Sequence, residues 1–86
     1  MEIIYSQKFA KEYKKLSESV KRIAEIKEKI FRKNPFDPKL KTHRLKGRLK
    51  DFYSFSIDYK YRIIFEFLKN KKVVYFHLVG KHDIYN

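Results

Sequence analysis

The chain has 86 residues, of which 43% are hydrophobic and 17% aromatic, so it can build one modest core in a single domain over residues 1–86. It has no cysteine, which excludes disulfides and thiolate metal sites, and no apolar run approaches the ~20 residues that span a bilayer. Lys and Arg number 22 against 10 Asp and Glu, a formal net charge of +12. Because such a charge attracts polyanions, we expect a polyanionic partner. The absence of cysteine fits a reducing cytosol and the apolar runs are short, so we also expect a cytoplasmic protein without membrane contact.

The first 35 residues predict a strand followed by two amphipathic helices. Residues 3–5 form a short β-type run that ends at Ser6, a residue type favoured at helix N-caps. Apolar residues then recur at helical spacing up to residue 16 and again from residue 20 to residue 31, with Ser17 as a second N-cap. Pro35 ends the second helix, because proline disfavours helical geometry in the residue before it. Two tightly joined antiparallel helices are the simplest interpretation.

A basic loop and a set of strands follow the helices. Residues 39–50 contain six Lys and Arg residues and no acidic residue. From residue 53 the apolar period changes to two, which predicts strands over residues 53–58, 61–68 and 72–79, separated by turns at residues 58–60 and around Asn70. The order β-α-α-β-β-β predicts an α+β domain in which a helical hairpin packs on an antiparallel sheet.

Three polar residues occupy positions suited to chemistry on a phosphodiester. His43 lies in the basic loop, Arg62 lies inside a predicted strand, and His82 follows the last strand. The period of two places Arg62 on the same face as Ser54 and Ser56, and we expect this face to leave room for a ligand. Histidine can give and take a proton near neutral pH, and arginine can hold a phosphate through paired hydrogen bonds. Metal-free RNA cleavage needs such groups, because the ribose 2′-OH must lose a proton, the 5′-oxygen must gain one, and the charge on phosphorus must be stabilised.

Each of these residues also has a structural interpretation. His43 could be a solvated loop side chain, Arg62 could pair with a nearby carboxylate, and His82 could belong to a surface pair. His77, inside an apolar strand, is most simply a half-buried structural residue. Three histidines without cysteine or a helical i, i+4 pair predict no metal site, and two glycines cannot supply a phosphate-binding or dinucleotide-binding loop, so we expect no cofactor.

Three segments resemble the RelE superfamily of toxins, the mRNA interferases of bacterial and archaeal toxin–antitoxin pairs. Residues 43–54, HRLKGRLKDFYS, resemble the family's H-x-L-x-G…(F/Y)(W/Y/R)S segment. Residues 61–65, YRIIF, resemble its (H/Y)-R-(L/I)-(V/I)-Y strand, and residues 79–85, VGKHDIY, resemble its closing segment. The resemblance covers nearly the whole chain in the right order and is closest to the YoeB and YafQ subgroups.

The resemblance implies a microbial-RNase-like fold, cleavage of mRNA in the ribosomal A site, and a cognate acidic antitoxin that covers the basic surface. It places His43 where related toxins keep a glutamate or histidine base, Arg62 at the phosphate-binding arginine, and His82 at the general acid. Either histidine could be the base and the other the acid, because their pKa values depend on burial and neighbours. Further residues expected to bind RNA are Lys46, Arg48, Lys81 and the terminal aromatic Tyr85.

The chain also departs from the family pattern. RelE itself carries lysines on the strand where this chain has Ser54 and Ser56, which excludes a lysine base there, and Ser56 and Lys60 replace a His and an Asp of YafQ-like toxins. One alternative is a ParE-like toxin that poisons DNA gyrase without nuclease chemistry, although that branch generally lacks a histidine at the position of His82. A basic RNA-binding module without activity is a third interpretation.

Overall fold

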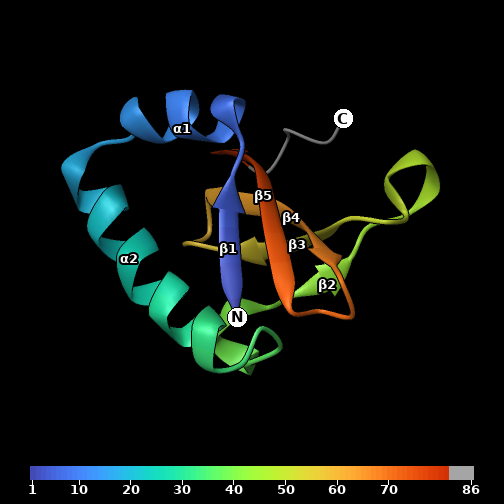
Figure 1. The fold of residues 1–86 in the computed structure, drawn as a ribbon. Helices are drawn as coiled ribbons and strands as arrows, with labels where there is room; N and C mark the ends of the chain where they lie inside the picture. Colours follow the sequence, from blue (N-terminus) through green and yellow to red (C-terminus); the bar gives the residue numbers. More distant parts are fainter. Residues whose placement is uncertain (82–86) are drawn as a thin grey trace.

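The computed structural model describes residues 1–81, and in this part of the chain two helices pack on a five-stranded sheet (Figure 1). Two single-turn 3₁₀ segments, Pro38–Leu40 and Gly47–Leu49, lie in the connection between the helices and the last strands. The predicted α+β class is confirmed. No helix among these residues is long and apolar enough to cross a membrane. The elements in chain order are β1 (Glu2–Tyr5), α1 (Gln7–Lys14), α2 (Glu18–Lys33), β2 (His43–Arg44), β3 (Tyr53–Ser56), β4 (Tyr61–Leu68) and β5 (Val73–Lys81).

The sheet has the strand order β1-β5-β4-β3-β2. Strands β2 to β5 pair antiparallel, whereas β1 runs parallel to β5, with Ile3 opposite Val74. The sheet is therefore mixed rather than wholly antiparallel as predicted, and the two-residue strand β2 was not predicted. Alternation of apolar and polar residues indicates which face a side chain occupies, but it carries no information on the direction of the neighbouring strand.

Both helices begin at the predicted serine N-caps. The hydroxyl oxygen of Ser6 accepts a hydrogen bond from the Phe9 amide at 2.9 Å, and that of Ser17 accepts one from the Val20 amide at 3.3 Å. The Ser6 hydroxyl also donates to the carbonyl oxygen of His77 at 2.8 Å, which ties the start of α1 to β5. These contacts fix where the first helix leaves the sheet.

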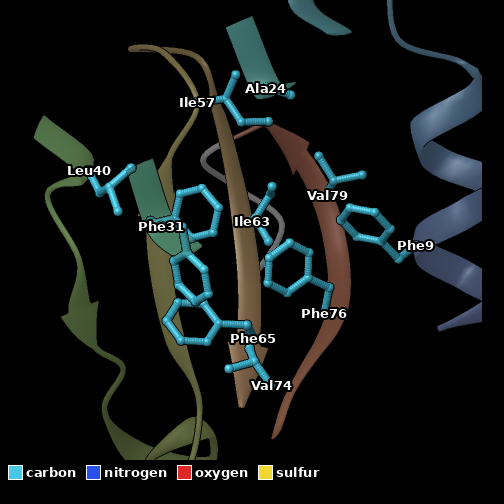
Figure 2. Close-up of a cluster of buried hydrophobic side chains, with 11 residues drawn as sticks. Phe9, Ala24, Phe31, Leu40, Ile57, Ile63, Phe65, Val74, Phe76 and Val79 are labelled. Atoms are coloured by element: carbon cyan, nitrogen blue, oxygen red, sulfur yellow. The ribbon is translucent and has the colours of Figure 1, made fainter. Parts of the chain in front are cut away.

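The main core lies between the helices and one face of the sheet (Figure 2). Phe31 of α2 is at its centre, with ring centroids 4.9 Å from Phe55 and Phe65 and 5.5 Å from Phe76, and all four rings are fully buried. Truncation of such a ring typically costs about 3–5 kcal/mol. One face of the three central strands is therefore committed to packing against the helices.

The opposite face of the sheet, called the open face below, is the one that neither helix covers. Its side chains alternate with those of the core along each strand, so that Arg62 and Ile64 flank the core residue Ile63. This confirms the predicted placement of Arg62 on the same face as the two serines of β3. The open face carries Ser54, Ser56, Arg62, Ile64, Glu66, Tyr75 and His77.

Candidate functional site

The register of the strands arranges the open face in rows. One row contains Ser56 and Arg62, and the next contains His43, Ser54 and Ile64. Directly opposed residues of antiparallel strands share a face, so His43 and Arg62 lie on the same side of the sheet. They are two strands and one row apart, on the order of 12 Å between Cα atoms. One ribose-phosphate unit of an RNA strand, held between the extended side chains of His43 and Arg62, can span this distance.

Arg62 is half-buried and braces the turn between β3 and β4. One nitrogen of its guanidinium donates to the carbonyl oxygens of Asp58 and Tyr61. The Asp58 carboxylate instead accepts hydrogen bonds from the amides of Lys60 and Tyr61, at 2.9 and 2.8 Å. Among the residues described, Arg62 forms no ion pair with a carboxylate. Its charge and its remaining N–H donors therefore stay available to an anion.

His43 is exposed and has a defined ring contact. Its Nδ1 lies 3.2 Å from the carbonyl oxygen of Lys41. A carbonyl can only accept, so this bond requires the proton on Nδ1 and leaves Nε2 of the neutral ring without one. In this tautomer Nε2 can accept a proton from a substrate hydroxyl, which is the requirement for a general base.

The connection between β2 and β3, residues 45–52, contains the second half of the basic loop and projects from the sheet (Figure 1). The amide of Leu45 donates to the carbonyl oxygen of Phe52 at 2.9 Å and closes the loop at its base. Lys46 and Arg48 are both exposed within it. None of the ion pairs found among residues 1–81 uses a base from residues 39–50. This segment therefore presents uncompensated positive charge beside the open face, which favours phosphate binding.

The end of β5 passes beside Arg62. Gly80 is the register partner of Arg62, and the exposed Lys81 is the partner of Tyr61. His82 and Tyr85 lie outside the described residues, so their expected roles stay predictions. Within residues 1–81 no three His, Asp or Glu side chains are arranged to hold a metal ion.

The burial of the two serines of β3 contradicts the expectation that their side of the sheet leaves room for a ligand. Ser54 is fully buried and Ser56 is 7% exposed. The Ser54 hydroxyl has no hydrogen-bond partner among residues 1–81, and such an unpaired group normally costs about 1–3 kcal/mol. Serine side chains are short, and longer neighbours on the same face can shield them. Of the polar residues that the sequence placed on this face, Arg62 and His43 are therefore accessible and the two serines are not.

A second polar pair on the open face was missed from the sequence. Nε2 of His77 lies 2.9 Å from Oε1 of Glu66, and both side chains are 31% exposed. Half-burial of His77 is as predicted, but its partner was not. A hairpin with its turn near residue 70 brings Glu66 opposite Tyr75 and next to His77, so the distance of each residue from the turn was the signal that could have found the pair.

Comparison with known protein families gives one match over almost the entire chain. A family model described as the bacterial toxin of the type II toxin–antitoxin system, YafQ, matches residues 1–85. A comparison with curated proteins finds no match.

Solved structures of similar fold include toxins of three kinds. YafQ from Escherichia coli strain BL21(DE3) is 19% identical, with a TM-score of 0.79 over 98% of this chain and 96% of that one. A YoeB/ParE toxin from Agrobacterium tumefaciens is 14% identical, with a TM-score of 0.81 over 95% and 99% of the two chains. The archaeal RelE–RelB complex from Pyrococcus horikoshii OT3 is 18% identical to this chain, with a TM-score of 0.77 over 95% and 94%. These similarities establish a shared fold.

Proposed function

The chain belongs to the YafQ family of type II toxin–antitoxin toxins, and on this premise we propose that it is an endoribonuclease that cleaves mRNA in the ribosomal A site and thereby inhibits translation. The observation that carries the proposal is the position of His43 and Arg62 on one face of the sheet, beside a basic loop whose bases form no ion pair with the described residues 1–81. A proton acceptor, a cation for the phosphate and an electrostatic track for the strand are the elements that RNA cleavage requires.

The proposed reaction is metal-independent transfer within one nucleotide. His43 takes the proton of the 2′-OH through Nε2, and the resulting oxygen attacks the adjacent phosphorus. Arg62 stabilises the charge that develops on the phosphoryl oxygens. As the bond from phosphorus to the 5′-oxygen breaks, His82 gives that oxygen a proton. The products are a 2′,3′-cyclic phosphate and a free 5′-hydroxyl.

Binding of the RNA strand is assigned to the remaining bases and one aromatic residue. Lys46 and Arg48 contact phosphates beside the scissile group, and Lys81 contacts the strand from the end of β5. We also assign Tyr85 to RNA binding, as the family resemblance implies. Charge contacts of this kind weaken steeply as salt rises.

Two partners follow from the charge and the family. A chain with a net charge of +12 suits both ribosomal RNA and an acidic antitoxin. The ten bases of residues 8–33 lie on the two helices and at the end of α1, away from the open face, and are assigned to these larger partners. The proposed site of action is the cytoplasm, where ribosomes and message are present.

Induced expression of point variants in a bacterial host tests the proposal. Arg62→Ala and His82→Ala should each abolish growth arrest and cleavage of message at equal protein levels. Lys72→Ala is the matched control, because Lys72 is an exposed base between β4 and β5, outside the segments assigned to RNA and to the larger partners. Thermal unfolding of the purified variants verifies that the fold survives. If the Arg62→Ala, His82→Ala double variant still cuts message, the assigned site is wrong, and if the wild type instead inhibits gyrase supercoiling, the ParE-like alternative holds.

A further inference from the structure

Three rings lie in contact on the open face, beyond the row that contains Arg62. The ring centroid of His77 is 4.8 Å from that of Phe52 and 4.5 Å from that of Tyr75. We call Phe52, Tyr75 and His77 the ring platform. All three side chains are half-buried, in contrast to the fully buried rings of the main core. The ring platform therefore presents aromatic surface to solvent on the face where His43 and Arg62 lie.

Local geometry holds the ring platform in place. At His77 the register between β4 and β5 slips, because Ile64 pairs with Leu78 whereas Phe65 pairs with Phe76. Such a bulge re-aims the extra side chain. The 2.9 Å contact with Glu66 then fixes the orientation of the imidazole. Glu66 acts here as a positioning residue for His77.

The charge around the ring platform favours RNA as its occupant. Phe52 lies two residues after the basic segment of residues 39–50, where six bases and no acid can hold phosphates, and one acid, Asp51, stands between them. Glu66 is an acid on this face, but its carboxylate is bonded to His77. Phosphates are therefore drawn toward the loop, and the rings beside it are left to contact bases.

We propose that the ring platform stacks an unpaired base of the RNA strand whose scissile phosphate is bound at Arg62; this inference rests on the proposed function and assigns a binding subsite within it. Aromatic side chains stack on bases of single-stranded RNA regardless of sequence. Glu66 and Arg62 are four residues apart on β4, about 13 Å along the strand. The stacked base therefore belongs to a neighbouring nucleotide and not to the one that is cleaved.

Fluorescence titrations of the full chain with two oligomers test this subsite. One is a 2′-O-methyl single strand, which cannot be cleaved by 2′-OH attack, and the other is an abasic strand with the same number of phosphates. Tyr75→Ala should weaken binding of the first about five- to tenfold and leave binding of the abasic strand unchanged. Tyr75→Phe keeps the ring in place and should bind the strand with bases within about twofold of wild type.

Chemical shifts report the contact without a substitution. The ring resonances of Phe52, Tyr75 and His77 should move when the strand with bases is added, and should move far less with the abasic strand. Two results would assign these rings a purely structural role and overturn the inference. One is a chemical-shift change of the same size with the strand with bases and the abasic strand, and the other is a Tyr75→Ala variant that loses affinity for both strands equally. A wild-type chain that binds neither strand would also overturn the inference.

Cleavage of ribosome-bound mRNA by the wild type separates this inference from the proposed function. Suppose that the wild type cleaves and that Tyr75→Ala reaches its half-maximal cleavage rate at the same concentration of ribosome-bound mRNA. The stacking subsite is then wrong while the proposed function stands. If the wild type does not cleave but discriminates the two oligomers through Tyr75, the nuclease proposal fails while the stacking site stands.

Discussion

Arg62 lies directly opposite Ser56 across β3 and β4, on the sheet face that the helices leave uncovered. The pairing matters because the other face of the same strands is filled by four phenylalanine rings around Phe31. The core thus determines which face remains for function. Arg62 forms no ion pair with a carboxylate of residues 1–81, and a cation in that state keeps its affinity for phosphate.

Replacement of Ser54 by alanine should leave the protein at least as stable as the wild type. The buried hydroxyl has no hydrogen-bond partner in the part of the chain that the structure describes, and its removal relieves a desolvation cost of about 1–3 kcal/mol. We expect the free energy of unfolding in urea to stay unchanged or rise, and cleavage to remain at wild-type level. A large loss of activity in Ser54→Ala at unchanged stability would show that the hydroxyl takes part in the reaction.

Removal of two loop bases should change the salt dependence of RNA binding. Each phosphate contact to a single strand contributes about −0.7 to the slope of log K against log salt. In the Lys46→Ala, Arg48→Ala variant we expect the slope to become less steep by about 1.4. The matched control removes two exposed bases of α2, Arg22 and Lys29, and should leave the slope with a short RNA unchanged. Equal effects of both variants would mean that the loop is not a specific phosphate site.

The contact of β1 with α2 predicts a pH dependence of stability. The Tyr5 hydroxyl donates a hydrogen bond to Glu28, and burial followed by this bond raises the pKa of Tyr5 above its ordinary value of 10.0. The stabilisation by the neutral hydroxyl is therefore complete below pH 10 and is lost as pH rises through the raised pKa. Tyr5→Phe should be less stable than wild type at pH 8, and this difference should shrink above pH 10. A pH-independent difference in urea midpoints would show that the bond contributes nothing.

Local patterns in the sequence were sufficient for the parts of the fold that depend on neighbours along the chain. The N-caps at Ser6 and Ser17 follow from residue type, and the shared face of Arg62 with the serines of β3 follows from a period of two. Three features were not predictable in this way: the parallel pairing of β1 with β5, the bulge at His77 and the burial of Ser54. They depend on which distant segment packs beside a strand, and alternation is the same for either direction or register.

The candidate site was also predictable only in part, because residue type and position are local features whereas contacts between strands depend on their register. The three polar residues stood out by type and position, and the structure brings His43 and Arg62 to one face. It also forms strand β2 from His43 and Arg44, which joins the basic loop to the sheet edge. The link between Glu66 and His77 depends on the register of the hairpin, for which the distance of each residue from the turn near residue 70 was the only signal in the sequence.

The central claim is tested most directly by primer extension on ribosomes paused at a defined codon, combined with chemical analysis of the new RNA ends. Wild-type protein should produce a cut within the A-site codon that leaves a 2′,3′-cyclic phosphate or 3′-phosphate, and Arg62→Ala should leave the message intact. An uncut message on ribosomes that bind the protein, or an equal yield of the same ends with Arg62→Ala, would contradict the assignment of this face as a ribonuclease site.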